Sequence, residues 1–324
     1  MGFLHPLYFL GIFLSLSLIS TQIIGSPKGG SGTDLDLASM GYSASSLAVG
    51  ESDAAQIQNP FAGYYNPAGL NSLDSWHTYS LQGNIGDGVS LYSVGIAAPL
   101  SPQWTINLNW VQIQASDIGL IATDNASLNT DLSATQLAIY SANGVTAALA
   151  YSLDDRLSFG LSSTFFSKSI SNIDHAKGYG LALTPGVTLK MTDSLNMGVY
   201  AKIVLSYLKW QTGTEETLGK WINVGLAYTL NSCTFFSEVD NPLESGGSLT
   251  KLGGAFKWNE VVTLRGGYTS PPGWNIQTDN PLQIGRLTVG LGLNLGMIMI
   301  DYAYVGGNDS RYSDASRVSI GAQF

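Results

Sequence analysis

Residues 286–296 read RLTVGLGLNLG, and this stretch decides the fold class. Its aliphatic side chains occupy every second position: Leu287, Val289, Leu291, Leu293 and Leu295. Threonine, glycine and asparagine fill the positions between them. Because successive side chains of a strand point to opposite faces, the segment predicts a β-strand with one aliphatic face and one small or polar face.

The same alternation recurs along most of the chain. It predicts fourteen strands, at 75–84, 88–98, 103–114, 133–152, 157–168, 178–190, 194–208, 220–230, 233–239, 248–258, 260–268, 284–296, 297–306 and 316–324. From Pro99 onward, short turns and longer polar loops alternate between these segments, although the earlier connection near Gly86–Gly88 is short where a long loop is expected. This order is typical of an antiparallel transmembrane β-barrel. The segment 133–152 is too long for one regular strand, so we expect a bulge or an extra turn near Asn143-Gly144.

The composition agrees with a membrane barrel. The chain has 324 residues, of which only 11% are charged, against about 25% in ordinary globular domains. A hydrophobic share of 44% excludes a disordered chain, and a single cysteine excludes a disulfide scaffold. The net charge of −9 argues against a nucleic-acid partner. A soluble all-β protein remains the alternative, but it would have an unusually uncharged surface.

The two ends of the chain indicate export. Residues 1–25 contain an apolar run closed by a small residue, which predicts a secretory signal peptide; a retained anchor helix is the rival reading. At the other end, Val318, Ile320 and Phe324 belong to an alternating segment that stops on phenylalanine. Such an ending resembles the assembly signal of bacterial outer-membrane barrels. We therefore expect the protein in the outer membrane of a Gram-negative (diderm) bacterium.

Residues 26–73 do not alternate and form a separate unit before the barrel of residues 74–324. A tether rich in glycine and serine opens this unit, and Asn66, Pro67, Ala68 and Gly69 read as a fixed turn near its end. A large barrel lined only by polar and glycine residues would be an open channel. We therefore expect these residues to form a hatch inside the lumen.

The small-residue run, the acidic pair Glu51 and Asp53, and the sequence Asn66–Leu70 before the first strand together resemble the FadL superfamily of outer-membrane proteins. The closing stretch 300–304 and the final Phe324 resemble most the PorV/PorQ-like branch. The resemblance implies a fourteen-stranded barrel with an N-terminal hatch. It departs from the family pattern at Tyr64-Tyr65, which interrupt the usual small residues.

The resemblance also implies function. Founding members of this superfamily take up hydrophobic molecules such as long-chain fatty acids by passive diffusion. Members near PorV instead act as non-transporting scaffolds or shuttles in a type IX-like protein secretion and surface-attachment system. The expected partners are outer-membrane lipid, a hydrophobic ligand such as a fatty acid, the barrel-assembly machinery and, under the alternative, secretion-system proteins.

Strand parity places most strand cations on the inward face. This set includes Lys202, Lys251, Lys257, Arg265 and Arg286. One hypothesis is a basic lumen that binds the carboxylate of an amphiphilic ligand. The simpler reading is that lipid excludes charges from the outward face.

Nothing in the sequence predicts an enzyme. His77 and His175 do not lie in a pattern that suggests a catalytic triad, and we expect them to be ordinary polar side chains. The spacing of potential ligands suggests neither a metal site nor a cofactor site.

Overall fold

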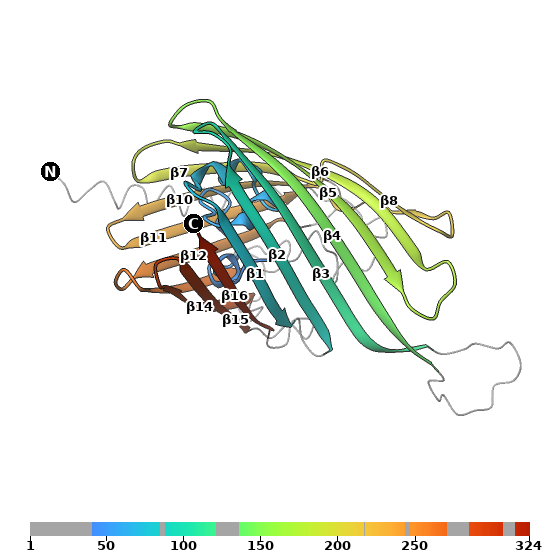
Figure 1. Ribbon diagram of the computed structural model, residues 1–324. Helices are drawn as coiled ribbons and strands as arrows, with labels where there is room; N and C mark the ends of the chain where they lie inside the picture. The colour runs from blue at the N-terminus through green and yellow to red at the C-terminus, as the bar shows by residue number, and fades with distance from the viewer. Residues whose placement is uncertain are drawn as a thin grey trace, which may run out of the picture.

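The computed structural model describes residues 41–84, 88–120, 136–216, 218–243, 247–270, 285–306 and 315–324 (Figure 1). The predicted signal peptide, 1–25, and the predicted tether after it lie outside these ranges. Among the described residues, no helix is long and apolar enough to cross a membrane.

The described chain is almost entirely strand. The strands are β1 (His77–Asn84), β2 (Val89–Pro99), β3 (Trp104–Leu120), β4 (Gln136–Ser152), β5 (Leu157–Ile170), β6 (Lys177–Lys190), β7 (Leu195–Lys202), β8 (Leu205–Trp210), β9 (Glu215–Glu216), β10 (Trp221–Leu230), β11 (Cys233–Pro242), β12 (Leu249–Lys257), β13 (Val262–Thr269), β14 (Arg286–Asn294), β15 (Ile298–Gly306) and β16 (Ala315–Gln323). Three short helices precede them, namely α2 (Ala44–Ala48), η2 (Pro60–Gly63) and η3 (Pro67–Ser72).

The strands form one closed antiparallel barrel. β1 pairs with both β2 and β16, and β5 pairs with β6, so the sheet closes on itself. β7 and β8 both pair with β6 and are two parts of one wall strand, whereas β9 pairs only with β8. The ring therefore has fourteen strands with β9 as an extra strand, which confirms the expected fold class and strand count.

Two irregularities differ from expectation. The predicted strand 194–208 is broken at Ile203, whose φ of 59° lies in the left-handed region that a β-branched side chain rarely adopts. The irregularity expected near Asn143-Gly144 lies instead on the partner strand, where the β3–β4 register shifts between Ala115 and Ile118. β4 itself is uninterrupted, and the bulge lies in β3, which has one extra residue over this stretch.

The outward face of the barrel is aliphatic and aromatic. Side chains such as Leu287 (55% exposed), Val289 (57%) and Ile320 (53%) point away from the lumen. Trp76 and Trp104 are exposed next to the short-turn end of their strands. Tryptophan favours a membrane–water boundary, so this distribution has the pattern of a barrel wall that faces lipid.

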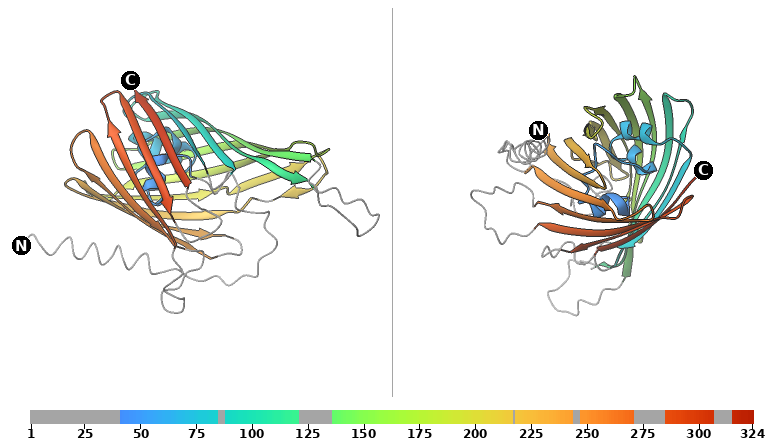
Figure 2. Two further views of the ribbon diagram at one scale, coloured as in Figure 1. Left: turned by 90° about the horizontal axis from the view of Figure 1, so that it is seen from below. Right: turned by 90° about the vertical axis from the view of Figure 1, so that its left-hand side faces the viewer.

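Residues 41–73, called here the lumenal segment, lie inside the barrel (Figure 2). Helix α2 contacts β13 to β16, η2 contacts β1 to β5, and η3 contacts β3 to β6. Nearly every residue of the segment is buried. The segment therefore fills the middle of the lumen and contacts most of the wall; whether it acts as a movable hatch stays a prediction.

Candidate functional site: the lumen and its two sectors

Glycines in the wall leave the space in which the lumenal segment packs. A Cβ atom at any of these positions would overlap an atom of the segment: Gly160, Gly186, Gly198, Gly253, Gly267 and Gly290. The first two face the turn at Asn66–Ala68, and the other four face residues 48–55. The abundance of glycine in the sequence thus has a packing cause, since backbone must approach backbone here.

The predicted turn at Asn66–Gly69 is present at the start of η3. The fully buried Asn66 side chain accepts a hydrogen bond from the Ala68 amide at 3.2 Å. Its amide group donates to the carbonyls of Ala54 (2.9 Å) and Val187 (3.2 Å). Asn66 is therefore both the N-cap of η3 and a link between two parts of the lumenal segment and β6.

A buried ionic cluster holds the other side of Ala54. Glu238 is 1% exposed and accepts hydrogen bonds from the Ala54 amide at 3.0 Å and from the Tyr200 hydroxyl at 3.1 Å. Lys251 lies directly opposite Glu238 in the β11–β12 register, 3.5 Å from it and 2.6 Å from Asp240. The Ala54 peptide is thus fixed by a wall carboxylate on one side and by Asn66 on the other.

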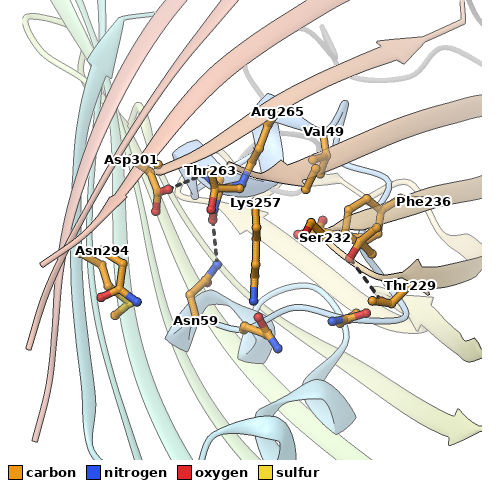
Figure 3. A pocket seen from close by; sticks show the side chains of 18 of the residues that line it. Val49, Asn59, Thr229, Ser232, Phe236, Lys257, Thr263, Arg265, Asn294 and Asp301 are labelled. Carbon is orange, nitrogen blue, oxygen red and sulfur yellow. Dashed lines mark hydrogen bonds and ion pairs between the residues drawn. The ribbon is translucent and has the colours of Figure 1, made fainter. Parts of the chain in front are cut away.

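A second ion pair lies in the wall of a cavity of about 310 Å³ (Figure 3). Arg265 of β13 contacts Asp301 of β15 at 2.6 Å, and Asp301 also accepts a hydrogen bond from Tyr79. Lys257 extends from β12 into this cavity toward the lumenal segment. The cavity also reaches the short turn at Asn231, so it lies on the short-turn side of the segment.

Asp53 of the lumenal segment lines the same cavity. Burial raises the pKa of its carboxyl from 3.8 to about 6, and the hydrogen bond from Ser46 (2.6 Å) opposes the shift. Its charge therefore changes in the mildly acidic range.

The remaining predicted cations are separate from one another. Lys202, at the end of β7, has its ammonium 5.6 Å from the ring centre of Tyr64 and 5.5 Å from that of Tyr65, in cation–π geometry. Arg286 is half-buried at the start of β14. The five candidates for carboxylate binding thus do not form one site, and Lys251 and Arg265 already contact carboxylates of the chain.

Part of the inner wall toward the long loops is apolar, which corrects the expectation of a lumen lined only by polar and glycine residues. Six large apolar side chains on β1, β2, β3, β5 and β8 face inward and are at most 4% exposed: Leu81, Leu91, Val111, Ile113, Phe166 and Leu208. They belong to one hydrophobic cluster with the lumenal residues Tyr42, Phe61, Tyr64 and Tyr65. We call these six wall residues the apolar sector, and Glu238, Asp240, Lys251, Arg265 and Asp301 the ionic sector.

Sequence reasoning missed the apolar sector for an identifiable reason. On β3 the apolar residues run on the outward parity up to Trp110, and Val111 and Ile113 then carry them on the inward parity. Two adjacent apolar residues at 110 and 111 were the available signal, because they mark the point where the apolar residues change from one face of the strand to the other.

Comparisons with known proteins support the fold. No family model matches the chain, and no curated protein matches it. Among solved structures, the P. putida toluene transporter TodX superposes with a TM-score of 0.66 at 14% identity, covering 89% of this chain and 99% of that chain. The Ralstonia pickettii toluene transporter TbuX gives 0.64 at 13% identity, covering 88% and 98%. A Pseudomonas aeruginosa FadL homologue gives 0.58 at 12% identity, covering 87% and 98%. At these identities the comparisons establish a shared barrel fold.

Proposed function

We propose that this protein is an outer-membrane β-barrel of the FadL type that admits hydrophobic small molecules by passive diffusion. The observation that carries the proposal is the apolar sector, which continues into the aromatic residues of the lumenal segment. Water-soluble molecules gain nothing from such a lining, whereas an apolar molecule leaves water on entering it. The fold shared with toluene transporters supports the same conclusion.

The route requires the lumenal segment to move. The segment separates the apolar sector from the polar cavity on the short-turn side. We propose that the turn at Asn66, Pro67, Ala68 and Gly69 is the part of the segment whose displacement opens the way. This turn has one side-chain bond to the wall, from Asn66 to the Val187 carbonyl, whereas three wall side chains bond to the backbone of residues 48–54.

The charge arrangement favours an uncharged ligand. In the ionic sector, Lys251 is paired with Glu238 and Asp240, and Arg265 is paired with Asp301. Binding a ligand carboxylate to either cation would therefore require breaking buried ion pairs. Of the five sequence-predicted cations, Lys257 is the one that we still propose for a carboxylate, because it reaches into the open cavity.

The membrane location is part of the proposal. The aliphatic outward face supports it, and Val318 (42% exposed), Ile320 (53%) and Phe324 (67%) lie on or at the end of outward-facing β16, as a C-terminal assembly signal would. Fractionation with the outer membrane and a mobility shift on unheated gels are the expected results. Recovery as a soluble protein that does not shift on heating would contradict it.

A disulfide tether tests the movement. The Cβ position of Gly63, in η2 of the half that we propose to move, lies 3.1 Å from the Ala148 Cβ of β4, close to the spacing that a disulfide requires. In a C233S background, G63C/A148C should lose uptake of a radiolabelled hydrocarbon into proteoliposomes when oxidised and regain it on reduction. The single variants G63C and A148C are the controls. Unchanged uptake through the oxidised tether would refute movement at this point.

Ligand identification tests the substrate class. Mass spectrometry of the protein purified from native membranes should find an uncharged apolar molecule in the lumen. The secretion scaffold remains the alternative expected from the sequence, and co-purification of large periplasmic or surface proteins without such a ligand would favour it.

A further inference from the structure

The outward face of β1 differs from the rest of the wall. Its outward side chains are Thr78, Ser80, Gln82 and Asn84. Every other strand of the ring, with β7 and β8 counted as one, has a large apolar side chain that is at least 36% exposed. β1 is fully described and has none. Among the described residues, β1 therefore forms a polar stripe between neighbours that carry large exposed apolar side chains.

Two polar side chains of this stripe form hydrogen bonds with the neighbouring strand β16, and a third does not. The Ser80 hydroxyl donates to the Ile320 carbonyl at 3.3 Å, and the Asn84 side-chain oxygen accepts from the amide and hydroxyl of Ser316 at 3.0 and 3.1 Å. The exposed Gln82 carboxamide has no hydrogen-bond partner among the described residues. Gln82 thus presents both donors and an acceptor to whatever lies outside the barrel.

A shallow groove of about 530 Å³ follows the stripe. Ser80 and Gln82 lie along its middle. Val318 and Ile320 of β16 border it on one side, and Val94 and Trp110 of β2 and β3 border it on the other. Gln112 of β3 and Tyr92 of β2 add polar groups at the level of Gln82, because both belong to the same register row. The groove therefore combines a hydrogen-bonding centre with apolar borders, as the centre of a protein interface within a membrane does.

We propose that this face binds a second copy of the chain, with β1 of one protomer against β1 of its partner. The inference rests on the membrane location proposed above, because an unpaired carboxamide is costly only against hydrocarbon. Glutamine, serine and threonine each donate and accept hydrogen bonds, so two copies of the stripe complement one another. The stripe carries no charged side chain, which favours an identical partner over one that needs an opposite charge. A two-fold axis near Gln82 would pair the same residues from both protomers.

Site-directed cross-linking tests the pairing. In a C233S background, Q82C protein in native outer membranes should form a disulfide dimer with an oxidant, which a reductant separates, and a thioether dimer with a short bis-maleimide, which a reductant leaves intact. The matched control is V289C, which places a thiol on the outward face of β14 at a position that is 57% exposed. It should remain a monomer. Equal, low dimer yields from Q82C and V289C would overturn the proposal.

Native mass spectrometry supplies an independent readout. The wild-type protein should have the mass of two chains, and Q82L should shift it to one chain while the barrel keeps its heat-dependent gel mobility. A single wild-type chain that carries a phospholipid, or a complex with a different protein, would overturn the second-copy assignment. Membrane fractionation of the same cells tests the location separately, so a membrane-bound protein without Q82C dimers contradicts the pairing alone.

Discussion

The two sectors of the lumen hold the lumenal segment in different ways. On the side of the ionic sector, wall side chains bond directly to the backbone of residues 41–54. Glu238 accepts from the Ala54 amide (3.0 Å), Thr269 donates to the Gly50 carbonyl (3.0 Å) and Thr288 donates to the Ala48 carbonyl (3.2 Å). Arg317 and Ser319 of β16 bond to Gly41 and Ala44 in the same way. This half of the segment is fixed by directional bonds along its length.

On the opposite side, residues 60–70 are held mainly by packing. Their side-chain bonds to the wall include those of Asn109 to the Pro60 carbonyl (3.1 Å) and of Asn66 to the Val187 carbonyl (3.2 Å). Directional bonds resume only at Asn71, whose carboxamide bonds to Thr105, Tyr151 and Ser152 at 2.9–3.1 Å. Apolar contacts are non-directional, and an apolar ligand can replace them without leaving a polar group unpaired. The difference indicates an anchored half and a displaceable half, with Ala54 at the boundary.

Removing the main anchor should have the largest effect. E238A leaves Lys251 with one of its two carboxylates and the Ala54 amide unbonded, and breaking such buried pairs costs about 3–5 kcal/mol. Urea unfolding of the purified barrel measures this cost. A thiol at Gly69, where a Cβ has ordinary contacts, should also react faster with a maleimide in E238A than in the otherwise unchanged G69C/C233S protein.

D301A is the matched control for this comparison. It also breaks a buried wall ion pair, Arg265–Asp301, but Asp301 has no bond to the lumenal segment among the described residues. It should lower the stability of the barrel without raising the labelling rate at position 69. Equal labelling rates in E238A and D301A would show that Glu238 does not anchor the lumenal segment more than another wall ion pair does.

A cavity in the apolar sector should cost less and leave the anchor intact. I113A truncates a fully buried side chain, and such changes cost about 2–5 kcal/mol. The free energy of unfolding should fall, and hydrogen exchange should increase in residues 60–70 while it stays unchanged in residues 44–54. Faster exchange in residues 44–54 of I113A would mean that the apolar sector also holds the anchored half.

Replacing a wall glycine that contacts the displaceable half should loosen that half alone. The added methyl of G160A would overlap the backbone at Pro67-Ala68, and overpacking typically costs about 1–3 kcal/mol. Hydrogen exchange should increase in residues 66–72 and stay unchanged in residues 44–54. G254A is the control, since a Cβ there would lie 3.9 Å from its nearest neighbour, the Thr234 carbonyl oxygen.

The smallest expected effect is the pH dependence contributed by Asp53. Its pKa rises from 3.8 to about 6 in the folded protein, so its protonated form is favoured by folding. Its stabilising contribution is complete below pH 3.8 and is lost as the pH rises through 6, at up to about 1.4 kcal/mol per pH unit. D53N should flatten the stability curve between pH 4 and 6. An unchanged slope in D53N would assign the dependence to another group.

Strand parity predicted the wall well because it is a local property. Leu287 and Val289 are exposed outward, and Lys251, Arg265, Glu238 and Asp301 face inward, as their alternation predicts. The turn at Asn66 was also predictable, since asparagine and proline have local backbone preferences. The inward position of Val111 and Ile113 was not predicted, because the apolar residues of β3 change parity after Trp110 and a single parity cannot describe the whole strand.

Strand parity could not predict which residues far apart in the sequence contact one another. Glu238 and the Ala54 amide are 184 positions apart in the chain, and Tyr79 and Asp301 are 222 apart. Parity placed the acidic and basic side chains on one face but could not tell which of them neutralise each other. A site inferred from inward cations alone therefore overestimated the charge that is free for a ligand.

By itself, the sequence determined that the chain forms an alternating, low-charge wall with its aliphatic face outward, because a strand sorts its side chains by position alone. Only the tertiary structure decided how the lumen is divided. Closing the barrel brings β11 to β16 against residues 41–54 and β1 to β6 against residues 60–72. The anchored half, the displaceable half and the polar stripe on β1 all arise from those neighbours, which sequence periodicity does not specify.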